Sequence, residues 1–562
     1  MTRVFCTFAR RFGQKTASGP AWLRAAQLFS AGFLSIAANC ASTSAEIISD
    51  RSCEDVAAYT VVENKVHRAA CRGDRIVLEP TESLDAAFLV RAIITHTSAQ
   101  KFKERGFRLQ GGRIAGEFRL QNLRFDMPAF SISATFEDIV DFSDSEFTGT
   151  VHLQDSKFAR GLLASRVVIR GSLKLGDTDD TQYDGGRAPG GSYAAFVRAP
   201  HARISGDVVV AGATIGEDLR FSNAQIGGSL SIMYATASRI GLWATEIGNQ
   251  LVFYNCAIRG QATGQNWDRS ALNLYSIRTK QSVYINRTSI QGGVSLGGAE
   301  IAGDLILLGS ELSSLHARSS KVAGTLGLGL NKGAAANSGE PDKWTRWIGQ
   351  SELDLTNANF GGFRSPEQIG VWPNNIYFHN LSYRSFSPDF CDGPVCRHDT
   401  TWFATWLGKQ ADDRKTYGPY KTTVDILLGQ GQILEAYDLA IRGHDAERDD
   451  AYRHGEWIRY TLLTLHRYTV GYGYRLYWVI YWIAGFVLLG SLVFRRTPEA
   501  RLNGMPYGLS YSFDLLVPLM KLRPSHYEID IQGGARYYFY FHKLVGWALS
   551  LILVATVSGI TK

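Results

Sequence analysis

Cysteines are the first residues here whose type and spacing could do chemistry. Two local pairs, Cys53 with Cys71 and Cys391 with Cys396, account for four of the seven. Their thiolates could bind zinc, but the spacings do not match those of zinc knuckles. Such pairs are typical of disulfides in an oxidising compartment, so we expect two disulfides and no metal site. Cys256 remains, and its place in an apolar pattern predicts a buried free thiol.

A second motif, TVGYG, consists of Thr469, Val470, Gly471, Tyr472 and Gly473. The same five residues form the selectivity filter of potassium channels. A filter needs an outer helix and a pore helix before it, whereas the stretch before this motif is basic and amphipathic. We therefore interpret the motif as a membrane-entry turn, with Arg467 and Arg475 facing lipid phosphates. A channel-like membrane protein is the less favoured alternative.

Other catalytic or cofactor signatures are absent from the sequence. The acidic run from Asp177 to Asp184 could bind Ca²⁺, but a solvated loop explains it better. There is no nucleophile elbow, no dinucleotide fingerprint, no CxxC motif and no distinctive pair of carboxylates. We predict no catalytic residue, no cofactor and no metal. An enzyme that acts on envelope polysaccharide along one flank of the fold stays open as an alternative.

The secondary-structure elements that would hold a functional site repeat along the sequence with a step of eleven residues. Apolar-x-apolar doublets recur at this step, followed by one more apolar residue seven places after the first member. They include Phe107-x-Leu109, Phe118-x-Leu120, Val140-x-Phe142, Val151-x-Leu153, Val208-x-Val210, Leu219-x-Phe221, Leu230-x-Ile232, Val283-x-Ile285, Val294-x-Leu296 and Leu305-x-Leu307. A doublet places two side chains on one face of a short strand and does not make a helical stripe. The repeat therefore predicts a mainly β protein built around a right-handed parallel β-helix, a solenoid.

Two eleven-residue units give about 22 residues in each coil of this solenoid, which we place at residues 107–385. Roughly eight coils about 4.8 Å apart predict a rod of about 40 Å. The pattern breaks at 176–200, 259–271 and 329–352. Residues 46–106 are expected to cap the first coil, with a helix over 84–103, and the aromatic stretch 372–390 is expected to close the last.

The pattern becomes helical after the solenoid. Residues 386–470 are predicted to form a helical module that includes a hairpin around Gly431, and residues 471–562 a membrane domain. Two uncharged stretches, 476–494 and 544–560, are long enough to be transmembrane helices. Arg495, Arg496 and Arg501 follow the first stretch, which places the connecting segment in the cytoplasm by the positive-inside rule.

The first 45 residues are predicted to be a signal peptide. A basic region without acidic residues precedes the apolar stretch 25–38, and small residues follow it. The net charge of +7 is dispersed over the chain, so no nucleic-acid partner is expected. The predicted signal peptide and the positive-inside rule both predict a bacterial inner-membrane protein whose solenoid lies in the periplasm.

Several stretches resemble a family of bacterial membrane proteins, many of them labelled membrane-associated oxidoreductase. They are Val90–Ala92, Arg105–Gly116, Leu353–Phe360, Tyr420–Ala436 and Gly471–Arg475. The resemblance implies a pentapeptide-like β-solenoid followed by C-terminal transmembrane helices, and it supplies no catalytic residues. We expect a structural or binding scaffold of the cell envelope, in contact with the lipid bilayer and with an envelope protein or polysaccharide.

Overall fold

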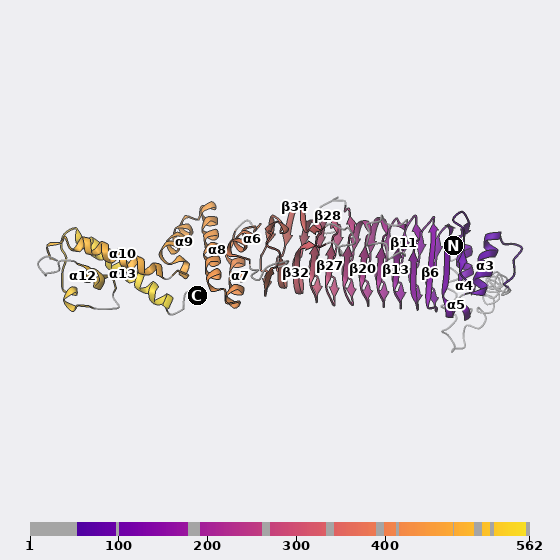
Figure 1. Cartoon of the computed structure of the whole chain (residues 1–562), viewed down its shortest axis with the longest axis horizontal. Coiled ribbons are helices and arrows are strands. Elements are labelled where there is room, and N and C mark those ends of the chain that lie inside the picture. The colour runs from indigo at the N-terminus through magenta and orange to yellow at the C-terminus, as the bar shows by residue number, and fades with distance from the viewer. Residues whose placement is uncertain are drawn as a thin grey trace, which may run out of the picture.

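The computed structural model describes residues 53–96, 100–177, 192–260, 270–332, 342–388, 398–411, 415–475, 477–499, 508–517 and 522–557. These residues form a long rod of stacked strands with a small cap at one end and a helical part at the other (Figure 1). The proposed signal peptide, Cys391 and Cys396 lie outside the described residues, as does part of each predicted interruption of the repeat.

Four ladders of parallel strands make up the rod. The first ladder contains twelve strands, which are β3 (Phe107–Ala115), β6 (Ala129–Phe136), β9 (Thr150–Gln154), β13 (Leu173–Gly176), β17 (Val208–Ala211), β20 (Leu230–Met233), β23 (Leu251–Tyr254), β27 (Val283–Asn286), β30 (Leu305–Leu308), β32 (Lys321–Asn331), the far end of β35 (Asn359–Ser365) and β38 (Phe386–Pro388). Twelve strands exceed the predicted eight coils, partly because β6 was not part of the predicted pattern. Its Phe130 and Ile132 are nevertheless buried in the core.

The second and third ladders complete two more sides of each coil. The second consists of β10 (Lys157–Phe158), β14 (Tyr193–Ala194), β18 (Thr214–Arg220), β21 (Thr236–Gly241), β24 (Ala257–Ile258), β28 (Ser289–Ser295), β31 (Glu311–His316) and β34 (Arg346–Asp354). The third consists of β4 (Phe118–Arg119), β7 (Val140–Asp141), β11 (Leu162–Leu163), β15 (Val197–Arg198), β25 (Leu272–Asn273), β36 (Asn375–Tyr377) and the far ends of the long strands β18, β21, β28, β31 and β34.

The fourth ladder carries the candidate site. Its strands are β5 (Arg124–Phe125), β8 (Glu146–Phe147), β12 (Val168–Ile169), β16 (Arg203–Ile204), β19 (Gln225–Ile226), β22 (Glu246–Ile247), β26 (Arg278–Thr279), β29 (Glu300–Ile301), the start of β32, β35 (Asn359–Ser365) and β37 (Ser382–Tyr383). One antiparallel strand, β33 (Lys343–Trp344), pairs with the end of β32.

The eleven-residue step has a structural origin in the corners of the coil. A left-handed backbone conformation recurs at Asp144, Asp155 and Arg166, whose φ angles are 61°, 56° and 56°. The same conformation recurs at His201, Gly212, Asn223 and Tyr234, again at intervals of eleven. Each such residue turns the chain from one short strand to the next. Each coil contains two corners of this kind, so a coil has about 22 residues and the sequence repeats twice within it.

Inward side chains form a continuous core along the rod. Near the N-terminal end this core is a stack of phenylalanines, in which the ring centroids of Phe125 and Phe147 lie 4.9 Å apart and those of Phe136 and Phe158 lie 5.4 Å apart. Further along, Ile, Leu and Val take the same positions and remain buried. Because each coil covers the apolar face of its neighbour, only the two ends of the rod require caps.

The N-terminal cap consists of α3 (Val61–Arg72), β1 (Ile76–Val77), β2 (Ser83–Asp85), α4 (Ala86–His96) and α5 (Gln100–Arg105). The single helix expected over 84–103 is therefore a short strand followed by α4, with α5 as a separate helix. Strands β1 and β2 both pair in parallel with β3 and so extend its coil by one layer. A disulfide between Cys53 and Cys71, with Cα atoms 5.5 Å apart, ties the start of the cap to α3.

Aromatic side chains close the C-terminal end of the rod. Trp372 and Trp406 are buried with ring centroids 5.3 Å apart, and Phe363 packs against both. Trp406 comes from α6 (Thr400–Leu407), so the cap combines the predicted stretch 372–390 with a helix. His398 stacks on Trp402 at 3.9 Å, and burial lowers the pKa of His398 to about 4.

Helices α7 (Gly418–Gly429) and α8 (Ile433–Arg453) form the predicted hairpin, with Gly431 in a left-handed conformation at the turn. Then come α9 (Trp457–Val470), the short helix η4 (Gly471–Gly473), α10 (Tyr477–Phe494), α12 (Leu509–Leu516), η5 (Pro524–Tyr527) and α13 (Ala535–Val557). Figure 1 shows α8 lying across the long axis of the molecule, whereas α10 and α13 run along it.

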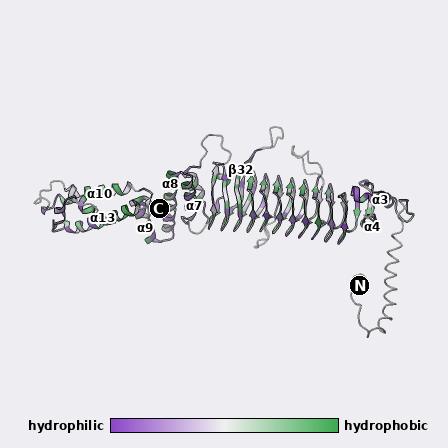
Figure 2. Cartoon of the chain, turned by 90° about the horizontal axis from the view of Figure 1, so that it is seen from below, coloured by the Kyte–Doolittle hydropathy of each residue, from purple (hydrophilic) through white to green (hydrophobic). Residues whose placement is uncertain are grey.

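Two of these helices, α10 and α13, are long and apolar enough to cross a membrane. Figure 2 shows hydrophobic residues along α10 in particular. Helix α13 begins at Ala535, nine residues before the predicted start at 544, because the aromatic run from Tyr537 to Phe541 continues the helix despite its charged neighbours. Gly546 of α13 permits close packing, since a Cβ there would lie 1.9 Å from the carbonyl oxygen of Leu516 in α12.

Replacement of Gly248 by alanine should destabilise the solenoid. A Cβ at this position would lie 1.9 Å from the carbonyl oxygen of Gly227 on the preceding coil, so the two coils would have to separate. Overpacking of this kind costs about 1–3 kcal/mol. We expect a lower midpoint of thermal unfolding, measured by circular dichroism in detergent. Gly370→Ala is the control, because its Cβ would meet nothing within 4 Å; equal midpoints for the two variants would contradict the packing argument.

Cys256 should resist alkylation in the folded protein. Burial raises the pKa of its thiol to about 11, and its Sγ lies 3.2 Å from the carbonyl oxygen of Ile232. At pH 8 the group is therefore protonated and shielded, and the reactive thiolate is scarce. Mass spectrometry of the Cys256 peptide should show little iodoacetamide adduct before denaturation and complete modification after it. Rapid modification of the native protein would show that the coil opens between β23 and β24.

Candidate binding groove on the solenoid

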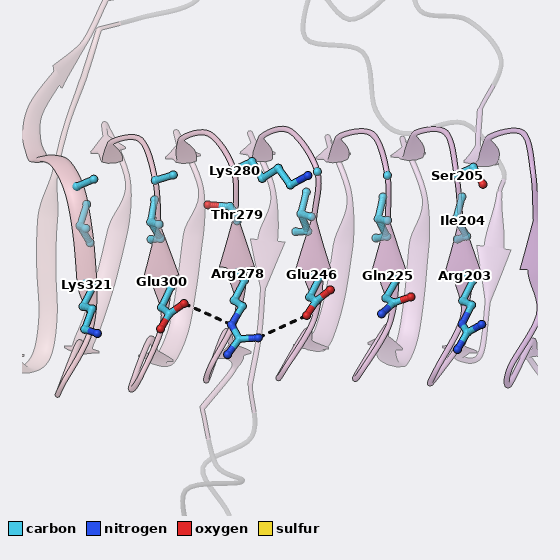
Figure 3. Close-up of a pocket in the computed structure, with 18 of the residues that line it drawn as sticks. Arg203, Ile204, Ser205, Gln225, Glu246, Arg278, Thr279, Lys280, Glu300 and Lys321 are labelled. Atoms are coloured by element: carbon cyan, nitrogen blue, oxygen red, sulfur yellow. Dashed lines mark ion pairs between the residues drawn. The ribbon is translucent and has the colours of Figure 1, made fainter.

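A groove of about 1300 Å³ runs along the fourth ladder. Three rows of side chains define it, one residue of each row from every coil (Figure 3). The first row is polar and contains Arg203, Gln225, Glu246, Arg278, Glu300 and Lys321. The second row points into the core and contains Ile204, Ile226, Ile247, Thr279, Ile301 and Val322. The third row contains Ser205, Gly227, Gly248, Lys280, Ala302 and Ala323.

Small side chains in the third row produce the hollow shape. The backbone of this row continues the ladder, since the Gly227 N–H donates to the Ile204 carbonyl at 2.7 Å and the Gly248 N–H donates to the Ile226 carbonyl at 2.8 Å. Strand residues with larger side chains would fill the space above these amides. The result is an open channel with a charged wall on one side and accessible backbone on the other.

Ion pairs between coils organise the polar row. Arg278 lies between two glutamates, with Nη1 3.5 Å from Glu246 Oε1 and Nε 3.3 Å from Glu300 Oε2 (Figure 3). The Arg278 side chain is 63% exposed and both glutamates are 52% exposed, so these pairs add little stability. Their alternation keeps like charges out of adjacent coils and orients the side chains along the groove.

The groove carries a net positive charge. Its lining includes five basic residues, Arg170, Arg203, Arg278, Lys280 and Lys321, and two acidic ones, Glu246 and Glu300, for a balance of 5 − 2 = +3. Within the described part of the chain, Arg203, Lys280 and Lys321 form no ion pair, and all three are exposed. Figure 3 shows Lys280 extended along the row of small residues toward the coil of Glu246. These three cations are available to an anionic ligand.

The two glutamates are poorly arranged for acid catalysis. A general acid in a glycosidase is usually buried away from cations, which keeps it protonated. Glu246 and Glu300 are instead more than half exposed and face the guanidinium of Arg278. Among the residues that the structure describes, no group of three or more His, Cys, Asp or Glu side chains could hold a metal ion. Recognition of charge is therefore the chemistry that the groove supports best.

A second, smaller cavity of about 370 Å³ lies on the third ladder. Its centre is the buried carboxylate of Asp218, which accepts from Arg198 Nη2 at 2.7 Å and pairs with Arg220 Nη2 at 2.9 Å. Arg220 in turn lies over the Trp243 ring, 5.1 Å from its centroid. Hydrogen bonding to Asp218 raises the pKa of Arg198. Asp218 pairs with both Arg198 and Arg220, so this cavity is a weaker candidate than the groove.

The predicted membrane-entry motif is a turn held against α8. Val470 ends α9, Gly471 has a φ of 56°, and Tyr472 is buried with its hydroxyl donating to Asp445 at 3.2 Å. Thr469 Oγ1 donates to the Leu465 carbonyl within α9, and Gly473 ends the turn shortly before α10.

The two arginines that flank this turn have different partners from those predicted. Arg467 Nε lies 3.0 Å from Asp445 Oδ1, and Arg475 Nη2 lies 3.4 Å from Asp438 Oδ1. Both were expected to face lipid phosphates, but both bind carboxylates of α8. The sequence did not reveal this, because the aspartates lie 22 and 37 residues before their partners.

The residues of the groove were also missed by the sequence. Most coils contribute only one polar residue and one small residue to it, and the polar types differ from coil to coil. Alignment of the chain on the inward apolar residues could have revealed the column, since Arg203, Gln225 and Glu246 each immediately precede an isoleucine.

Comparisons with known proteins add no relative, since no protein-family model, no curated protein and no solved structure matches the chain.

Proposed function

We propose that this protein is a scaffold of the bacterial cell envelope, anchored in the inner membrane, whose periplasmic solenoid binds an anionic polymer along the groove. The observation that carries the proposal is a groove whose three cations, Arg203, Lys280 and Lys321, form no ion pair among the described residues, on a rod whose C-terminal end bears two helices apolar enough to span a bilayer. We also propose a right-handed coil, because right-handed connections between parallel strands are strongly preferred.

Exposure of the C-terminal helices supports the membrane anchor. On α10 the large apolar side chains of Ile480, Tyr481, Leu488 and Leu492 are each more than half exposed. An apolar helix that is a core element of a soluble protein would be covered. Arg495 and Arg496 follow α10 directly and favour the cytoplasm for the connection to α12. The solenoid then lies on the opposite, periplasmic side.

Spacing in the groove favours a linear polymer over a small ligand. Arg203 and Lys321 stand five coils apart along the ladder, which corresponds to roughly 24 Å at about 4.8 Å for each coil. A single small anion could contact only one of these cations. An acidic polysaccharide could contact all three while its backbone lies over the row of small residues. A polysaccharide-acting enzyme in the same groove remains the alternative, and the binding experiment below separates the two.

Labelling in intact cells tests the topology. A Pro200→Cys variant should react with a membrane-impermeant maleimide, because residue 200 belongs to the periplasmic solenoid. An Arg496→Cys variant should react only after lysis, because it follows α10 on the cytoplasmic side. The unsubstituted chain gives the background from its native cysteines. Protection of residue 200 in intact cells would overturn the periplasmic placement.

Charge reversal tests the groove. We expect full-length protein carrying Lys280→Glu and Lys321→Glu to bind polygalacturonate about tenfold more weakly than the unsubstituted chain, which corresponds to about 1.4 kcal/mol. The difference should shrink as salt is added, because exposed charges are screened. Lys157→Glu, on the second ladder, is the control and should bind normally.

Two results would contradict the scaffold proposal. Equal affinity of the double variant and the control would exclude the groove as the binding site. Release of new reducing ends from the polymer, abolished by Glu246→Gln or Glu300→Gln, would replace the scaffold by the enzyme alternative.

A further inference from the structure

Helix α9 has an unusual distribution of polarity for a helix at the surface of a protein. Its exposed side is apolar, since Trp457, Ile458, Leu462, Leu465 and Tyr468 are all at least 60% exposed. At 100° for each residue these side chains fall on one face, together with the uncharged Thr461. Within the described residues, no element of the chain covers this face.

The charged residues of α9 lie on the opposite side, toward α8. Arg459 pairs with Glu447, and Arg467 pairs with Asp445 at 3.0 Å. Hydrogen bonding to His444 lowers the pKa of Glu447, as do the hydrogen bond and the charge of Arg459. The two arginines of α9 therefore pair with carboxylates of α8, while the large side chains that α9 exposes most are apolar.

The apolar face is continuous with the proposed membrane anchor. Trp482 of α10 donates from Nε1 to the Tyr468 carbonyl of α9 at 2.9 Å. Val470, at the end of α9, packs in one cluster with Val479 of α10 and Leu549 of α13. Figure 1 shows α9 between α8 and the start of α10. The bilayer that holds α10 and α13 thus begins where the exposed face of α9 ends.

Length decides how α9 can meet that bilayer. Its 14 residues extend about 21 Å, which is too short to cross a hydrocarbon core of about 30 Å. Helices with an apolar face that contains Trp and Tyr commonly lie in the interface, parallel to the membrane plane.

We infer that α9 is an interfacial helix, whose face of Trp457, Ile458, Leu462, Leu465 and Tyr468 inserts among the lipid acyl chains of the periplasmic leaflet. This inference rests on the proposed membrane anchor and adds a second contact with the same bilayer. Two spans alone would leave the rod free to tilt. Helix α8 is joined to α9 by ion pairs and packs on α7. An α9 that lies in the interface would therefore fix the direction of the solenoid relative to the membrane.

Lipid quenching tests the inference on the full-length protein. An environment-sensitive residue, dansylalanine, would replace one side chain at a time by genetic encoding: Leu462→dansylalanine on α9, Leu488→dansylalanine on α10 and Lys157→dansylalanine on the solenoid. Each variant would be reconstituted into vesicles of phosphatidylethanolamine and phosphatidylglycerol, with or without lipids that carry a nitroxide near the top of the acyl chain.

We expect the nitroxide lipid to reduce the fluorescence of the probe at 462 and to leave the probe at 157 unchanged. A loss at 488 but none at 462 would overturn the interfacial helix and leave the anchor intact. No loss at either position would overturn the anchor and the inference with it. A probe at 462 that is shielded from both water and lipid, in particles that contain two chains, would show that a second copy covers α9 and would also overturn the inference.

Discussion

Parallel pairing between successive coils is the constraint on which this structure depends. Each coil must satisfy its backbone N–H and C=O groups through its two neighbours, and each must present its apolar side chains to the same central stack. Both conditions hold only if every coil turns at the same places. The left-handed residues at intervals of eleven provide these turns, and the strands Val208–Ala211, Leu230–Met233 and Leu251–Tyr254 therefore stay in register.

The same constraint produces the groove. Register places Arg203, Gln225, Glu246 and Arg278 in one column although the chain distances between them differ. Close stacking then requires small residues at positions such as Gly248, where a Cβ would meet the neighbouring coil. A row of polar and charged side chains thus lies beside a row of mostly small residues, which gives a shallow surface suited to an extended ligand. Binding on this rod is a property of several coils together.

At its C-terminal end the exposed surface of the molecule changes from polar to apolar. The aromatic cap around Trp372 and Trp406 closes the solenoid, and the hairpin of α7 and α8 follows. Beyond α8 the exposed side chains become apolar, first on α9 and then on α10. Two arginines of this region, Arg467 and Arg475, pair instead with Asp445 and Asp438 of α8.

The sequence by itself determined the repeating fold, the helical hairpin and the two apolar helices, because each leaves a local periodic pattern of burial. It also indicated a buried Cys256 and the local pair Cys53 and Cys71, which the structure joins. Only the tertiary structure decided which residues form the groove. Glu246 and Arg278 are neighbours in the ladder although 32 positions separate them in the chain, so a fixed step of 22 residues does not align them. Tertiary contacts also changed the interpretation of Arg467 and Arg475, which were expected to face lipid phosphates. Both guanidinium groups pair with carboxylates that are distant in the sequence. Helix α9 shows both kinds of information. Its amphipathic pattern can be read from the sequence, but which side of the helix is left exposed depends on where α8 packs.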